Sequence, residues 1–336
     1  MPKNKQKKKQ KLAVFKESKP PPDPVEDDED DEDEEESEEE GLEIEDHNEK
    51  EASLNVDFGF FDPRDSDFHG VRALLTSGGA NSLLPSQYDV GSLAAVLSEQ
   101  VEVGSVVKVI ADNSEEPENV DDVLGILTAI NLHTHRDKPF AKEFRASVTQ
   151  RCAGDAKAKE QLQAVLSDKS TGIVISSRML NLPAALIPSL VDSLMQDVEW
   201  AAKNADPPED RAQYKFKKLL LLATVEMPSS SGGAAGPSSE RDGDGNDDAS
   251  GSADDGGGKK KKRKKAAQQE AAMALASQLE GLTFARVEEE VLAANAEFSV
   301  LLNAAGRTRQ LLLCLSPQAI RSSVPAMHAA MGDGED

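Results

Sequence analysis

Charge is sorted along this chain into long runs of one sign, and these runs limit which parts of it can fold. Residues 1–19 contain eight lysines, and Asp23–Glu40 contains 15 acidic residues among 18. Runs of like charge repel themselves and bury too little apolar surface to form a core. We therefore predict a disordered tail over residues 1–52, basic first and acidic afterwards.

A second stretch, residues 227–265, is built of Ser, Gly, Asp and Pro without periodicity and predicts an inserted flexible loop. It ends in seven consecutive basic residues, which predict a nuclear-import signal read by an import receptor. These residues are Lys259, Lys260, Lys261, Lys262, Arg263, Lys264 and Lys265. The Lys3–Lys11 arm could serve the same purpose or contact nucleic acid weakly. We expect the nucleus as location, including the nucleolus and shuttling to the cytoplasm.

Cysteine usage and hydropathy indicate a soluble protein of a reducing compartment. Cys152 and Cys314 form no disulfide framework, and both lie on apolar patterns typical of a core. No apolar run approaches the roughly 20 residues that span a bilayer, and no apolar segment follows the N-terminal lysines as a secretory signal requires. We expect no membrane contact and a monomer.

The first foldable stretch predicts a strand, a break and a helix. Leu54, Val56, Phe58 and Phe60 alternate with polar residues or glycine, as in a strand that is buried on one face. Asp62-Pro63 ends the strand, since proline lacks the N–H that the ladder needs. Ser66 or Asp67 can cap a helix whose apolar stripe comprises Phe68, Val71, Leu74 and Leu75.

The remaining foldable sequence predicts strands and helices in mixed order. Helices are expected over residues 89–99, 138–153, 156–168, 181–204, 266–279 and 317–330. Strands are expected over residues 105–111, 123–132, 171–177, 214–225, 297–302 and 309–315. Mixed order with hairpin connections favours an α+β domain of three layers around a mixed central sheet, although the strand order stays open. Residues 53–226 and 266–331 are expected to form this single domain.

The opening stretch resembles the signature of the BCCIP family, whose fungal members are called BCP. The resemblance is carried by Asn55, Asp57, Phe58, Phe61, Asp62, Pro63, Asp67, Phe68, His69 and Gly70. Phe284-Ala-Arg-Val-Glu-Glu-Glu290 resembles a second family pattern. The resemblance implies a domain similar to the GNAT acetyltransferase fold, but a fold does not carry an activity with it.

Acetyl-coenzyme A binding needs successive backbone N–H groups at a strand-to-helix turn. Arg151-Cys-Ala-Gly-Asp-Ala156 matches the letters of that motif, yet a predicted helix precedes it and Asp155 would repel a phosphate. Arg178–Pro183 is the better topological equivalent and contains no glycine. We therefore predict no enzyme activity and no cofactor. The rival hypothesis is an acetyl-coenzyme A-dependent acetyltransferase with a degenerate site.

Other site chemistry is weakly represented. His133 and His135 could present two metal ligands on one face of a strand, but no third ligand completes a site. His69 has no nucleophile in a recognisable setting, so we expect it to hold its turn by a hydrogen bond. We predict no catalytic and no metal site.

An acidic hairpin loop is expected between the strands at 105–111 and 123–132. It is either a solvated loop or a client-binding rim formed by Glu115, Glu116, Glu118, Asp121 and Asp122. With the acidic tail, it favours a non-catalytic nuclear chaperone or adaptor that shields a basic client and does not bind nucleic acid directly. The family resemblance implies a large-subunit ribosomal protein as client and roles in ribosome biogenesis, protein transport and nuclear export. For animal members it implies a DNA-repair and cell-cycle scaffold that binds BRCA and a cyclin-dependent kinase inhibitor, which stays open here.

Overall fold

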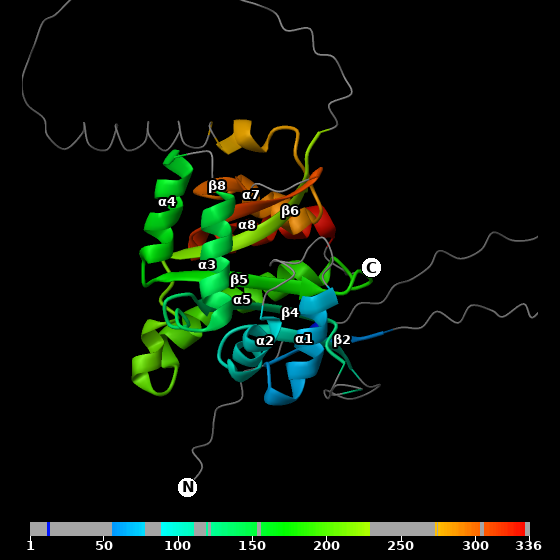
Figure 1. Cartoon of the computed structure of the whole chain (residues 1–336). Coiled ribbons are helices and arrows are strands. Elements are labelled where there is room, and N and C mark those ends of the chain that lie inside the picture. Colours follow the sequence, from blue (N-terminus) through cyan, green and yellow to red (C-terminus); the bar gives the residue numbers. More distant parts are fainter. Residues whose placement is uncertain are drawn as a thin grey trace, which may run out of the picture.

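A mixed sheet runs through the middle of the protein in a computed structural model (Figure 1). The structure describes residues 12–13, 56–77, 89–110, 119, 122–152, 156–228, 273, 275–302 and 306–332. Within them, the sheet has nine strands in the order β1-β2-β3-β4-β5-β6-β9-β8, with β7 paired to β6 beside this path. The strands are β1 (Leu12–Ala13), β2 (Phe58–Phe61), β3 (Ser105–Val109), β4 (Gly125–Asn131), β5 (Thr171–Arg178), β6 (Lys218–Glu226), β7 (Thr283–Phe284), β8 (Phe298–Leu302) and β9 (Thr308–Leu315).

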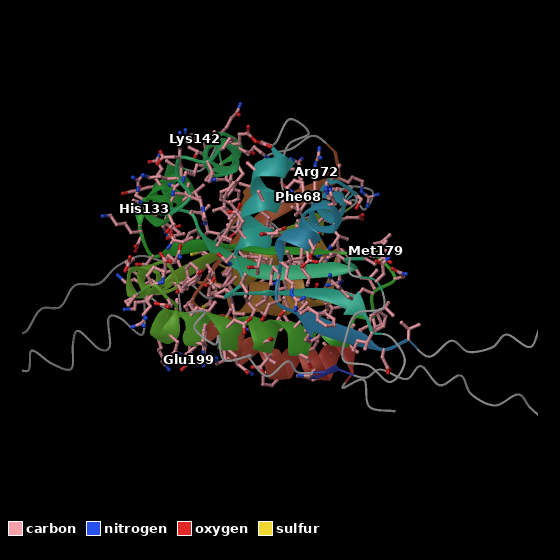
Figure 2. All side chains as sticks on the ribbon, turned by 90° about the horizontal axis from the view of Figure 1, so that it is seen from below. Phe68, Arg72, His133, Lys142, Met179 and Glu199 are labelled. Carbon is pink, nitrogen blue, oxygen red and sulfur yellow. The ribbon has the colours of Figure 1, made fainter. Side chains whose placement is uncertain are left out.

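Helices cover both faces of the sheet and give three layers (Figure 2). The first face carries α1 (Phe68–Ser77), α2 (Val90–Glu99), α3 (Pro139–Arg151) and α4 (Ala156–Ser167), whose apolar residues pack in one cluster. The second face carries α5 (Leu186–Asn204), α7 (Val287–Ala294) and α8 (Pro317–Met331), packed in another. Short 3-10 turns, η1 (Asp65–Asp67) and η3 (Pro208–Ala212), precede α1 and β6. The predicted α+β class with a mixed sheet is confirmed.

Among the described strands, β5 and β6 form the parallel pair, and they soon diverge. Their ladder covers Thr171–Ile173 against Lys218–Leu220. Beyond it, β5 continues to pair with β4 and β6 continues to pair with β9. We call the opening between the diverging ends the strand split. Because each strand turns one edge toward this opening, the backbone groups on those edges need other partners.

Most predicted elements occur within a few residues of their expected bounds, including the β8–β9 hairpin. Two starts are wrong. The predicted strand at Tyr214 begins only at Lys218, because the preceding residues turn, with the Phe216 N–H donating to the Tyr214 carbonyl. The predicted helix at 181 begins at Leu186, because the preceding residues form two turns. In these turns the Leu182 N–H donates to the Met179 carbonyl and the Leu186 N–H donates to the Pro183 carbonyl.

The opening strand is also buried differently from the prediction. Phe60 packs in the cluster under α5, and Phe61 packs in the cluster under α1 and α2. Both faces of β2 are therefore covered, whereas alternation predicted one buried face. Consecutive aromatics in a four-residue strand are the pattern of a doubly covered strand.

Candidate binding surface and strand split

The signature stretch is organised by the buried carboxylate of Asp67. Its Oδ2 accepts the Arg64 backbone N–H at 2.9 Å, and its Oδ1 lies 2.6 Å from Lys108 Nζ on β3. Both side chains of the ion pair are at most 4% exposed. A buried pair of this kind holds only if each partner is satisfied, so Asp67 fixes the start of α1 against the sheet.

His69 does not hold this turn, contrary to the prediction. Its side chain is exposed, and its ring packs edge-on against Phe68 at 5.1 Å between centroids. The hydrogen bond that closes the turn is accepted by Asp67, two residues earlier. A carboxylate next to a helix start accepts hydrogen bonds from the backbone N–H groups there. Asp67 therefore has the role that was predicted for His69.

Acidic groups meet at the end of the sheet where β2 and β4 begin. The β2–β3 register places Asp57 opposite Ile110, and Asp122 lies two residues before Leu124, whose N–H donates to the Val107 carbonyl of β3. Asp122 is exposed and accepts a hydrogen bond from Asn119 Nδ2 at 3.0 Å. The other members of the predicted rim, Glu115, Glu116, Glu118 and Asp121, lie outside the described residues, as does Asn55 of the signature.

An exposed apolar turn lies at the same end of the sheet, directly after β5. Leu180 is fully exposed and Met179 is 46% exposed, although the neighbouring Leu182 is buried. The Met179 N–H donates to the Leu124 carbonyl at 2.9 Å, two residues from Asp122. We call Asp57, Asp122, Met179 and Leu180 the acidic end; Figure 2 shows Met179 at this end of the sheet.

The strand split is filled by the chain itself. The Ala285 N–H donates to the Thr224 carbonyl at 2.9 Å, and Glu289 Oε2 accepts the Thr224 N–H at 2.9 Å. The β6 edge at this point is thus satisfied by Ala285, which directly follows β7, and by Glu289 in the first turn of α7. A ligand that pairs with this edge would have to displace them.

The β5 side of the split is held by an ion pair. Both terminal nitrogens of Arg178, the last residue of β5, donate to the Glu288 carboxylate. Beside the pair lies a cavity of about 30 Å³, lined mostly by apolar side chains of the sheet, α5, α7 and α8 and by Ser176, Glu288 and Glu289. This volume is of the order of a water or two, far below what a coenzyme needs.

Glu289 is the most perturbed acid of the split. Burial raises its pKa from 4.5 to about 7, and Glu288 adds to the shift. The Thr224 N–H, Arg286 and Arg178 act in the opposite direction. Burial also lowers the pKa of Arg286, with a contribution from Arg178. Desolvation therefore outweighs the hydrogen bond and the nearby cations.

Sequence reasoning missed the burial of these glutamates. Three consecutive glutamates at a helix start are typical of a solvated first turn that favours the helix dipole. In the structure Glu288 and Glu289 are buried and only Glu290 is exposed. The available signal was the Phe284–Glu290 family pattern.

The stretch that matched the coenzyme motif lies between two helices, as expected. Arg151 ends α3 and Ala156 begins α4, while 153–155 are outside the described residues. The Arg151 guanidinium donates to Gln310 Oε1 on β9 at 2.5 Å. The setting therefore lacks the strand-to-helix turn that binds a pyrophosphate.

The predicted placement of His133 and His135 on a strand is wrong, because β4 ends at Asn131. His133 lies 3.2 Å from Arg136, and His135 packs on Phe140. Nowhere in the described ranges do three His, Cys, Asp or Glu side chains gather as metal ligands. Cys152 and Cys314 are buried, as predicted.

The remaining predicted site lies beyond what the structure describes. The basic run Lys259–Lys265 falls outside the described residues. Of the helices that the structure does describe, none has the length and hydropathy to cross a bilayer.

Comparison with known proteins gives consistent matches. The BCCIP family model matches residues 53–292. A protein named Protein BCCIP homolog from Arabidopsis thaliana is 30% identical over 182 residues, which cover 54% of this chain and 52% of the relative. Protein bcp1 from Schizosaccharomyces pombe is 30% identical over 177 residues, covering 51% of this chain and 56% of the relative. The matched part thus spans little more than half the length of these relatives.

A solved structure shares the fold. The crystal structure of BCP1 from Saccharomyces cerevisiae is 14% identical, covers 85% of this chain and 93% of that chain, and superposes with a TM-score of 0.50.

Proposed function

The chain belongs to the BCCIP family, and from that premise we propose that it is a non-catalytic nuclear chaperone or adaptor for a basic protein. The client is a large-subunit ribosomal protein, shielded from nucleic acid until delivery, so that the protein serves ribosome biogenesis, protein transport and nuclear export. Every lysine or arginine of such a client would otherwise gain free energy by releasing counterions from RNA.

The observation that carries this proposal is the acidic end. It combines carboxylates with two adjacent exposed apolar side chains, Met179 and Leu180, which supply apolar contact area beside the charged groups. Apolar anchors at the centre of a charged rim supply most of the affinity in protein interfaces. The predicted rim, Glu115 to Asp121, joins this end through Asp122 and would extend it toward a basic surface.

The filled strand split supports a non-catalytic role. We propose that the domain is a relative of the GNAT acetyltransferase fold in which α7 occupies the opening that a coenzyme would enter. Ala285 and Glu289 take up the two backbone groups of Thr224, and Arg178 is neutralised by Glu288 instead of a phosphate.

Two measurements on the full chain test the proposal together. Acetyl-coenzyme A at millimolar concentration should leave the melting temperature unchanged, since a ligand stabilises only the state it binds. A purified basic large-subunit ribosomal protein should be captured at about 0.1 M salt and released by about 0.5 M, because screening shortens the reach of charges. A coenzyme-induced rise in melting temperature would favour the acetyltransferase. Capture that is insensitive to salt would refute the acidic surface.

The nuclear location is tested separately. Deleting Lys259–Lys265 should lower nuclear accumulation of a fluorescent fusion, because the import receptor binds an exposed basic run. Undiminished accumulation would mean that the Lys3–Lys11 arm suffices.

A further inference from the structure

The end of the sheet opposite the acidic end is basic. Three turns meet there: the one after β4 (residues 132–138), the one before β5 (168–170) and the one before β6 (213–217). With the first turn of α3 they expose six cations, which we call the basic end: Arg136, Lys138, Lys142, Lys169, Lys215 and Lys217. Figure 2 shows His133 and Lys142 on this side and Met179 at the other. On a chain with a net charge of -24, this concentration of positive charge is unexpected.

The buried side chain of Asn131 fixes the three turns against one another. Its Nδ2 donates to the carbonyls of Lys169 and Gln213, at 3.0 and 2.9 Å. Its Oδ1 accepts the N–H groups of His133 and Thr134. The cations therefore project from a preorganised backbone, so binding a polyanion costs less ordering entropy than it would on a loose loop.

Two titratable groups at this end respond to nearby cations, whereas burial, Glu102 and Asp210 raise the pKa of Tyr214 in the turn before β6. Burial lowers the pKa of His133, and Arg136, Lys169 and Arg145 lower it further. The Ser170 amide lowers the pKa of Asp168, and Lys217 adds to that effect. The acidic groups at this end are Asp137, which lies 3.6 Å from Arg136, Asp168, Glu297, which pairs with Lys218, and Glu102 and Asp210, which act on Tyr214. They leave a positive excess.

The chain carries its own polyanion within reach of this surface. Asp23–Glu40 contains 15 carboxylates against eight lysines in residues 1–19, so acid remains in excess after the arm is neutralised. Glu40 is joined to Val56 by 16 residue steps, which extend to about 50 Å. The strand β4 separates the two ends by about 20 Å. A tethered segment acts at an effective concentration of about millimolar. A free polyanion of similar affinity must exceed this concentration to displace the tract from the basic end.

We propose that the acidic tract Asp23–Glu40 docks on the basic end of its own chain. The cations of the basic end attract the carboxylates of the tract, and the carboxylates of the acidic end repel them. The docked tract therefore lies away from the acidic end. A basic client then competes with Arg136, Lys169 and Lys217 for the tract, so that only clients of high charge density release it. The proposal is independent of the client: the tract can dock whether or not the acidic end binds a ribosomal protein.

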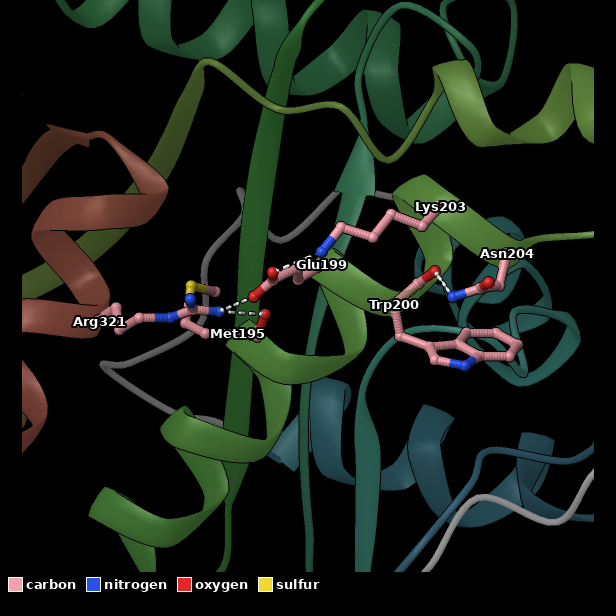
Figure 3. Close-up of polar contacts among 6 residues, drawn as sticks. All are labelled: Met195, Glu199, Trp200, Lys203, Asn204 and Arg321. Carbon is pink, nitrogen blue, oxygen red and sulfur yellow. Dashed lines mark hydrogen bonds and ion pairs between the residues drawn. The ribbon is translucent and has the colours of Figure 1, made fainter.

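The single tryptophan makes the docking measurable in the full chain. Trp200 lies near the end of α5, which leads through η3 to the Gln213 turn of the basic end. Figure 3 shows its ring pointing away from the Glu199–Arg321 ion pair, and the side chain is 43% exposed. Ser37→Cys places a thiol inside the tract without changing its charge, and both native cysteines are buried. An acceptor on that thiol reports energy transfer from Trp200.

Two matched variants decide the outcome. Lys169→Glu/Lys217→Glu reverses two charges of the basic end, while Lys157→Glu/Lys159→Glu reverses two exposed charges on the first turn of α4. At about 0.05 M salt we expect transfer at least about twofold lower in the first variant than in the second, which should match the unsubstituted chain. At about 0.5 M salt all three should converge. Equal transfer at low salt, or an equal loss in both variants, would overturn the proposal; melting curves check that each variant folds.

An RNA probe tests the other occupant. Single-stranded polyuridine at micromolar concentration should not reduce the transfer, because the tethered tract is present at about a thousandfold higher effective concentration. A fall in transfer that depends on Lys169 and Lys217 would assign the basic end to RNA and overturn the proposal.

Discussion

At the scale of single residues, the strongest charge interactions in the protein are made by buried side chains and not by surface ion pairs. Asp67 with Lys108 fixes α1 to β3, and Glu289 binds the Thr224 N–H inside the strand split. Surface pairs such as Lys203–Glu199 are screened and contribute little. The buried groups therefore determine how stability depends on substitution and on pH.

Replacing Glu289 by glutamine should flatten part of the pH dependence of stability. The folded carboxyl keeps its proton up to about pH 7, whereas the unfolded one loses it near 4.5. Between pH 4.5 and pH 7 the folded chain binds more protons than the unfolded chain. The contribution of Glu289 to the free energy of unfolding is therefore complete below pH 4.5 and is lost as pH rises through 7. The full effect is about 3 kcal/mol.

Urea unfolding of both chains at pH 5 and pH 7.5 measures this contribution. Glu289→Gln keeps an oxygen to accept the Thr224 N–H, and its stability relative to the unsubstituted chain should rise with pH. A stability difference that is constant over this range would contradict the raised pKa.

Removing the cation from the buried pair should cost far more than removing a surface one. Lys108→Met leaves the Asp67 carboxylate buried without that partner, and should lower the free energy of unfolding by about 3 kcal/mol or more. Lys203→Ala, which breaks an exposed pair, should change it by less than about 1 kcal/mol. Denaturant unfolding of both variants checks the contrast, and similar losses would show that the buried pair has no special weight.

At the scale of elements, the three layers depend on close contact where β5 enters the sheet. Gly172 lies in the short ladder to β6, and a Cβ there would lie 2.5 Å from the Phe216 ring and 2.9 Å from the Ile130 carbonyl. Neither can yield easily, since one is packed in the core and the other belongs to β4. The diverging strands beyond this point create the split that α7 fills.

Gly172→Ala should therefore destabilise the protein by about 1–3 kcal/mol. Gly91→Ala supplies a milder control, because its Cβ at the start of α2 would meet only Asp89 Oδ1, at 3.3 Å, and alanine favours a helix over glycine. Thermal melts should show a clearly larger loss of stability for Gly172→Ala than for Gly91→Ala. A stable Gly172→Ala variant would mean that β5 can shift within the sheet.

Local patterns predicted the elements well where periodicity was long, as in α2, α3 and the β8–β9 hairpin. They failed where hydrogen bonds between distant segments determine where an element begins, as at the turn before Lys218. The strand order could not be predicted, because pairing between β6 and β9 joins segments 80 or more residues apart. The strand split could not be predicted either, because the residues that form it and fill it come from β5, β6 and α7.

At the scale of the whole molecule, charge separates two ends of one sheet. The acidic rim was predicted from the run Glu115–Asp122, of which the structure describes Asp122, and the rim stays a prediction. The exposed Leu180 was not predicted, because a lone leucine in a turn has the same pattern as a buried one. The basic end was not predicted either, since its six cations come from separate turns that only the fold brings together.

The most direct test of the account is the affinity for a basic ribosomal protein after reversal of the acidic rim. Titration calorimetry at about 0.1 M salt compares Glu115→Lys/Glu116→Lys/Asp121→Lys with Glu99→Lys/Glu160→Lys/Glu209→Lys, a variant of equal net charge whose sites are exposed elsewhere. We expect an affinity at least about tenfold weaker for the rim variant and a nearly unchanged affinity for the other. Equal affinities of the two variants would contradict this expectation.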